Sequence, residues 1–190
     1  MKKALISALL LFLVCGAHGQ VTDSNTVDVS LQATLPESLT LTLNSGGIQT
    51  IASLSPGALN AFPSPVNVTT SWVLKPGRTS VALYAYFDSA TSALVHQDPA
   101  NSVDIPAGAV RVQINAGAFQ PLTNSVPFGA ANAGLQLFNV AITGANRNVS
   151  RTDNLNLELD LSSNVNGQDM TQLPADTYMG TLHIRAQATL

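Results

Sequence analysis

Few residues of this chain could perform acid–base or metal chemistry. Beyond the first twenty positions the only histidines are His96 and His183, and the only glutamates are Glu37 and Glu158. His183 lies between two apolar residues of an alternating stretch, which places it on an outward face, and His96 lies in a predicted loop. Isolated histidines of this kind are more often solvated than ligands or bases. We therefore predict no metal site and no cofactor.

The two glutamates do not indicate a hydrolase. A glycosidase needs two facing carboxyl groups, one of them kept protonated by burial. Glu37 follows Pro36 in a predicted turn, and Glu158 falls on the polar face of an alternating strand, so we expect both to be solvated. The sequence also contains no zinc-hydrolase histidine pair and no serine esterase elbow. A protein without enzymatic activity is predicted, and a secreted hydrolase is the least favoured function.

A cluster of oxygen-bearing side chains near residue 166 resembles a calcium loop only in composition. Asn164, Asn166 and Asp169 surround Gly167, but Leu173 stands where an EF-hand would place its bidentate glutamate. Asn-Gly is also a common pair in tight turns, because both residues tolerate a positive φ. The pair therefore predicts a turn at this place.

Aromatic side chains offer the one candidate binding surface. Trp72 alternates in step with apolar neighbours, which predicts a core position, whereas Tyr84 and Tyr86 share the opposite face of a strand. If that face is open, the two tyrosines could contact a sugar ring or a neighbouring subunit. Cross-strand packing within the sheet is the alternative.

The first nineteen residues have the layout of a secretory signal. Two lysines precede an apolar run, and small residues at Ala17 and Gly19 mark a cleavage point. We expect 1–19 to be removed and 20–26 to form a flexible leader of a secreted or cell-surface protein. Cleavage would also remove Cys15, the single cysteine of the chain.

The charges that remain exclude two classes of partner. The chain has eight basic and eleven acidic residues, and two of the basic ones, Lys2 and Lys3, lie within the predicted signal. No basic patch is left to bind nucleic acid or anionic lipid. No later apolar run is long enough to predict insertion into a membrane.

The rest of the chain shows the period of two that is typical of half-buried β-strands. The clearest example is 154–161, in which four leucines alternate with polar residues. A second example is 27–35, where the apolar positions are Val27, Val29, Leu31, Ala33 and Leu35. Further alternation occurs over 39–43, 66–74, 81–87, 110–114, 135–142 and 182–190, and Gly and Pro separate these runs. The pattern predicts one all-β domain over 27–190, an antiparallel sandwich of immunoglobulin-like or pilin-like Greek-key type.

Tyr178 stands at the corner that leads into the last predicted strand. A tyrosine at such a position can bond its hydroxyl back to the preceding loop, as in the tyrosine corner of Greek-key sandwiches. A partly buried strand tyrosine is the alternative. Both interpretations give Tyr178 a structural role.

The ending LPADTYMGTLHI, from Leu173 to Ile184, and the opening VDVSLQATLPESL, from Val27 to Leu39, resemble bacterial exported pilin-like proteins. Spore coat protein U-like and fimbrial subunit families belong to this group. The resemblance implies a sandwich fold and a place at the cell surface.

The leading hypothesis is a non-enzymatic exported structural protein. Strands near the two ends of the domain, with Val27 to Leu35 as the assembly strand, would be shared between copies or with other surface subunits. The alternative is a carbohydrate-binding or adhesive module that uses Tyr84 and Tyr86 to contact glycans.

Overall fold

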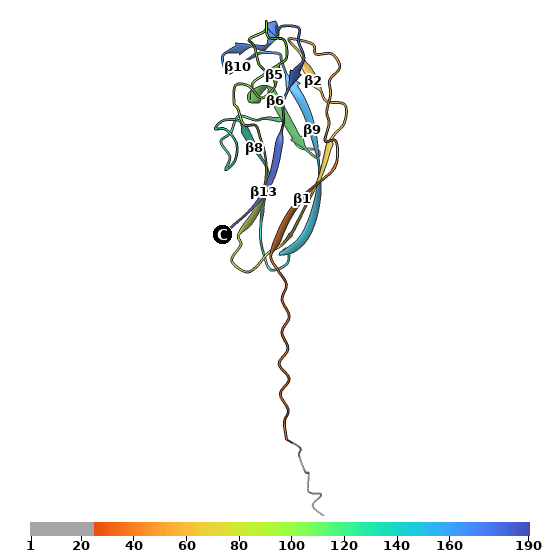
Figure 1. Cartoon of the computed structure of the whole chain (residues 1–190), viewed down its shortest axis with the longest axis vertical. Coiled ribbons are helices and arrows are strands. Elements are labelled where there is room, and N and C mark those ends of the chain that lie inside the picture. Colours follow the sequence, from red (N-terminus) through yellow and green to blue (C-terminus); the bar gives the residue numbers. More distant parts are fainter. Residues whose placement is uncertain (1–24) are drawn as a thin grey trace, which may run out of the picture. The chain divides into compact units, whose positions relative to one another are not determined.

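The computed structural model describes residues 25–190, and the chain divides into two units between Thr34 and Leu35 (Figure 1). The predicted signal peptide, 1–19, and residues 20–24 of the predicted leader lie outside the described residues. Across 25–190 we find no helix with the length and apolar character needed to cross a membrane.

The unit Leu35–Leu190 is built from strands, with two single-turn 3₁₀ helices, η1 (Ala107–Ala109) and η2 (Met170–Gln172). The strands are β1 (Ser38–Ser45), β2 (Leu59–Ala61), β3 (Val66–Val73), β4 (Ser80–Tyr86), β5 (Val95–His96), β6 (Val110–Ile114), β7 (Gln120–Pro121), β8 (Gly134–Ala141), β9 (Asn148–Asp160), β10 (Asn164–Val165), β11 (Gln168–Asp169), β12 (Tyr178–Met179) and β13 (His183–Thr189).

Every strand pair is antiparallel, so the predicted all-β antiparallel class is confirmed. The larger sheet has the order β1-β3-β9-β6-β7, with β2 also paired to β9. The smaller sheet has the order β13-β4-β8. Two short pairs, β10 with β11 and β5 with β12, lie outside these sheets.

Alternation in the strands produces a single hydrophobic core to which both sheets contribute. In β3, Val68 and Trp72 are buried at 2% and 3% exposure, and Trp72 donates its ring N–H to the carbonyl of Asn146 at 2.8 Å. In β4, Val81, Leu83 and Ala85 are fully buried. Both sets belong to one cluster, which β6, β8 and β9 complete. The predicted core position of Trp72 is therefore confirmed.

Two features of the predicted strands are wrong in the structure. The segment 27–35 pairs with no strand, and its large apolar side chains are exposed, so it is not half-buried. The strand predicted at 154–161 is longer, because β9 begins at Asn148. Arg151 and Asp153 continue the inward face of β9 with charged side chains, and the apolar pattern does not reveal that extension.

Candidate subunit-interaction site

β1 is an edge strand of the larger sheet and β13 is an edge strand of the smaller one, and the two lie next to each other (Figure 1). β1 pairs only with β3 and β13 pairs only with β4, so each strand has one side without a strand partner among the described residues. We call this side of the molecule the β1–β13 edge. Its core-facing residues, as the register sets them, are Leu39, Leu41 and Leu43 on β1, and Ile184, Ala186 and Ala188 on β13; all of them except Leu43 pack against the core.

The core-facing side chains of the β1–β13 edge are incompletely covered. Ala85 and Leu83 of β4 are fully buried, while Ile184 and Ala186, their register partners on β13, are only partly buried. On β1, Leu43 is 54% exposed. Since none of the six residues is charged, the edge offers apolar side chains beside unpaired backbone, which is the surface that an added strand recognises.

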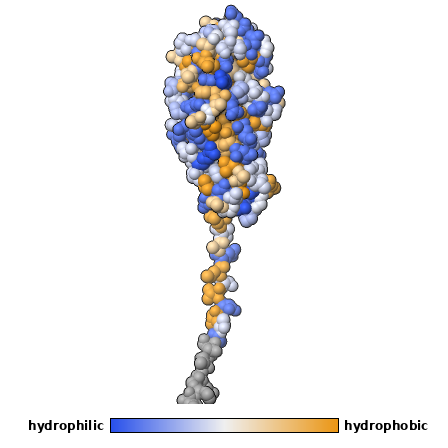
Figure 2. Space-filling model, turned by 180° about the vertical axis from the view of Figure 1, so that it is seen from behind, coloured by the Kyte–Doolittle hydropathy of each residue, from blue (hydrophilic) through white to orange (hydrophobic). Residues whose placement is uncertain are grey.

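The segment 27–35 has the complementary pattern. Val27 and Val29 are 77% and 75% exposed, Leu31 is 91% exposed, and Leu35 is 75% exposed, and each alternates with a polar residue. Figure 2 shows hydrophobic side chains on the described residues that precede β1. Since side chains two residues apart share one face of an extended strand, these residues would form one apolar face if the segment paired with a sheet edge.

Tyr84 and Tyr86 do share the outward face of β4, but the loop before β8 covers that face. Phe128 of this loop has its ring centre 5.9 Å from both tyrosine rings, and the Arg185 guanidinium lies 4.1 Å from the Phe128 ring centre. Tyr86 also stacks on His183 at 5.2 Å. Tyr84 is only 7% exposed, so it presents no open ring face to a sugar.

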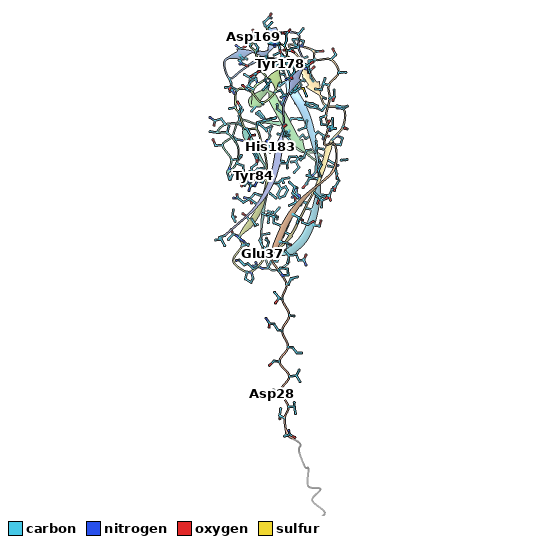
Figure 3. The ribbon with its side chains drawn as sticks, viewed as in Figure 1. Asp28, Glu37, Tyr84, Asp169, Tyr178 and His183 are labelled. Atoms are coloured by element: carbon cyan, nitrogen blue, oxygen red, sulfur yellow. The ribbon has the colours of Figure 1, made fainter. Side chains whose placement is uncertain are left out.

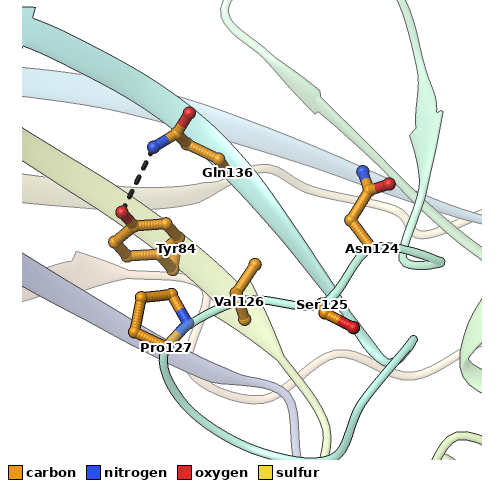
Figure 4. Close-up of a pocket in the computed structure, with 6 residues that line it drawn as sticks. All are labelled: Tyr84, Asn124, Ser125, Val126, Pro127 and Gln136. Atoms are coloured by element: carbon orange, nitrogen blue, oxygen red, sulfur yellow. Dashed lines mark hydrogen bonds between the residues drawn. The ribbon is translucent and has the colours of Figure 1, made fainter.

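A pocket of about 480 Å³ lies beside Tyr84 (Figure 4). Its lining carries no charge and consists of Tyr84, Asn124, Ser125, Val126, Pro127 and Gln136. The Gln136 side-chain amide donates to the Tyr84 hydroxyl at 3.2 Å. Tyr84 thus lines the pocket although it is almost completely buried.

The histidines and glutamates that could carry out acid–base chemistry are dispersed over the molecule. His96 Nδ1 lies 2.6 Å from Asp104, while His183 Nε2 lies 3.2 Å from Asp88. Figure 3 places His183 midway along the unit and Glu37 at one end. Within 25–190, no three His, Cys, Asp or Glu side chains come close enough together to hold a metal ion.

The two glutamates have different environments. Glu37 accepts hydrogen bonds from Arg78, the shorter at 2.9 Å, and these bonds are the main cause that lowers the pKa of the carboxyl group. Glu158 is 8% exposed and lies 3.1 Å from Arg111, so the expectation that it is solvated is wrong. The alternating pattern identified its face correctly but did not show that Arg111 of β6 covers it.

The end that carries Tyr178 has the predicted structural contacts. Tyr178 donates its hydroxyl proton to the Pro174 carbonyl at 2.8 Å, as expected for a tyrosine corner. At the same end, labelled by Asp169 in Figure 3, Asn166 and Gly167 have φ of 49° and 82° and connect β10 to β11. The predicted positive-φ turn is confirmed.

No family model matches the chain, and no curated protein or solved structure shows a significant similarity to it.

Proposed function

We propose that this protein is a non-enzymatic exported surface subunit that assembles by strand sharing. The segment 27–35 of one copy adds to the β1–β13 edge of the next copy, where it pairs with β13 and covers the exposed apolar residues. The subunit is a pilin-like β-sandwich of immunoglobulin-like type whose smaller layer is one strand short. Repetition of the same contact produces a linear, head-to-tail assembly.

One observation carries the proposal. At the same level of the smaller sheet, the core-facing residues of β4 are fully buried whereas those of β13 remain partly exposed. The inward side chains of an edge strand stay partly exposed in this way when no further strand pairs with its open side. The segment 27–35 has the alternation and the apolar face that a strand at this position needs. Charged residues are only 10% of the chain, which weakens electrostatic repulsion between copies.

Substitutions at matched positions test the proposal. Leu31 and Ile48 are both 91% exposed, and Leu43 and Leu59 are 54% and 56% exposed. In each pair the first residue belongs to the proposed contact and the second does not. We expect Leu31→Asp and Leu43→Asp to abolish assembly of the signal-free chain, whereas Ile48→Asp and Leu59→Asp leave it intact.

Analytical ultracentrifugation over a range of concentrations, with negative-stain microscopy, measures the assembly. A mixture of Leu31→Asp and Leu43→Asp chains should form dimers, because one variant retains the acceptor edge and the other retains the donor segment. A wild-type chain that stays monomeric at high concentration, or a Leu31→Asp chain that assembles like the wild type, would show the proposal to be wrong.

A further inference from the structure

A second pair of strand edges is open on the molecule. β3 pairs with 148–155 of β9, but on the other side of β9 the partner β6 covers only Leu155–Leu159. Residues 148–153 therefore have one side without a strand partner in the described chain. β8 is the second edge of the smaller sheet, because β4 is its only strand partner and an isolated bridge to Asn124 occupies only its first residue, Gly134. We call this second side the β8–β9 edge.

Two inward residues of β9 at the β8–β9 edge are charged, whereas β8 contributes apolar inward residues such as Leu135 and Val140. Arg151 and Asp153 of β9 pair in register with Thr70 and Val68, two fully or nearly fully buried residues of β3. Arg151 Nε lies 2.7 Å from Asp153 Oδ2, and Asp153 is 2% exposed. The Asn115 side-chain amide also donates to Asp153, at 2.8 Å.

The guanidinium of this ion pair also contacts the smaller sheet. The Arg151 guanidinium lies 4.2 Å from the ring centre of Phe138, which belongs to β8 in the smaller sheet. The Arg151 side chain stays 33% exposed, so water still solvates part of its charge. An incoming apolar strand would have to pass this guanidinium to reach the core.

The two edges thus differ in what they offer to the segment 27–35. Covering Arg151 with apolar side chains would remove its remaining water without supplying a new partner, and such desolvation is costly. Charged residues that point inward at an open sheet edge are a known means of preventing strand addition. The six core-facing residues of the β1–β13 edge carry no charge and impose no such cost.

We propose that Arg151 and Asp153 close the β8–β9 edge to strands from other copies. Each subunit then accepts one strand, at the β1–β13 edge, and the assembly cannot branch. This inference rests on the proposed strand sharing and specifies which of two open edges takes part in it.

Hydrogen exchange on the signal-free chain, before and after assembly, tests the inference. Newly paired backbone amides exchange more slowly, so we expect 183–189 to slow by about tenfold or more on assembly while 148–153 stay unchanged. In an Arg151→Leu/Asp153→Leu variant we expect 148–153 to slow as well, and microscopy should show branched assemblies.

The matched control is Arg111→Leu/Glu158→Leu. This variant removes an arginine–carboxylate contact of 3.1 Å on the opposite face of β9 and leaves the inward ion pair in place. We expect its assemblies to remain unbranched, with exchange at 148–153 unchanged. Circular dichroism establishes that each variant is folded before its exchange is compared.

The outcomes separate the two proposals. Slower exchange at 148–153 in wild-type assemblies, together with slowing at 183–189, would overturn the selective closure while strand sharing stands. A folded Arg151→Leu/Asp153→Leu variant without slowing at 148–153 would also overturn the closure. Unchanged exchange at 183–189 in the assembled wild type would instead overturn strand sharing itself. The wild-type measurement decides the question even if the double variant does not fold.

Discussion

Replacement of Tyr178 by phenylalanine removes one hydroxyl group and keeps the ring that packs against the core. The hydroxyl donates to the Pro174 carbonyl at 2.8 Å and accepts from the Asn101 side-chain amide at 3.0 Å. Asn101 still donates to Asp176 in the variant, at 2.9 Å in the wild type, so it does not lose every partner. The substitution therefore deletes two neutral hydrogen bonds at the corner that leads into β13.

The expected loss follows from these two bonds. A neutral hydrogen bond contributes about 0.5–1.5 kcal/mol net, and Tyr178 is partly exposed, so we expect Tyr178→Phe to lower the free energy of unfolding by about 1–2 kcal/mol. For a domain of this size, about 2–4 °C of Tm accompanies each kcal/mol, which predicts a decrease in Tm of about 2–8 °C at pH 7.

The difference between wild type and variant should also depend on pH. Burial raises the pKa of Tyr178, and the charges of Asp176 and Asp104 raise it further, while the Asn101 hydrogen bond acts in the opposite direction. In the unfolded chain a tyrosine ionises near about pH 10. Because the folded pKa is the higher one, the contribution of Tyr178 is complete below that pH and is lost as the pH rises through the folded value.

Urea unfolding at pH 7 and at about pH 10.5 measures both effects. From pH 7 to about pH 10.5 the wild type should lose more stability than Tyr178→Phe does. The difference in the free energy of unfolding between wild type and variant should therefore be smaller at the higher pH. Tyr86→Phe is the matched control, because it keeps the ring contacts with Phe128 and His183 and should stay within about 0.5 kcal/mol of the wild type. Equal stabilities of wild type and Tyr178→Phe at pH 7, or a gap that does not change with pH, would refute this reasoning.

Two other substitutions test the loops around the sheets. Asp176 accepts hydrogen bonds from the Asn101 amide, which is the main cause that lowers its pKa, and from the backbone of Asp98 and Thr177. The contribution of Asp176 to stability is present above about pH 4 and is lost as the pH falls through the folded pKa. In an acid titration followed by circular dichroism, Asp176→Asn should therefore lose stability less steeply below about pH 4 than the wild type does. Gly129 has φ of 73°, and a Cβ there would touch the Tyr86 ring and lie 2.7 Å from the Phe87 carbonyl oxygen. Gly129→Ala should therefore lower stability by about 1–3 kcal/mol in thermal melts, and by more than Gly57→Ala, which has φ of 74° but no atom within 4 Å; an equal effect of the two alanines would contradict the steric reasoning.

The sequence predicted the parts of the fold that depend on local pattern. Alternation identified β3, β4 and β13 with the correct inward faces, and Asn166-Gly167 identified the turn between β10 and β11 because the required backbone angles favour those two residues. Tyr178 was interpretable for the same reason, since the carbonyl that it reaches is only four residues away in the chain.

The candidate site could be predicted only in part, because its geometry depends on contacts between distant segments. Phe128 covers Tyr84 across 44 positions of sequence, and Arg111 covers Glu158 only because β6 and β9 pair in one particular register. Alternation in 27–35 indicates the period of a strand but does not specify which sheet edge such a strand would join. The open side of β13 likewise becomes visible only when the strand order is known.

In the proposed assembly, the charged inward residues of β9 connect the folding pattern of the strand with the choice of edge. Arg151 and Asp153 interrupt the apolar alternation in the part of β9 that has only β3 as a strand neighbour. From Leu155 onward β6 also pairs with β9, and the inward residues there are apolar again: Leu155, Leu157 and Leu159. A strand position that is covered by neighbours on both sides can be apolar without inviting a partner, whereas an open one cannot. Both strands of the β1–β13 edge depart from this rule, because Leu41 and Ile184 remain apolar beside unpaired backbone; at the β8–β9 edge only β8 does so, and β9 carries the ion pair. That departure is the physical reason to assign strand addition to this edge.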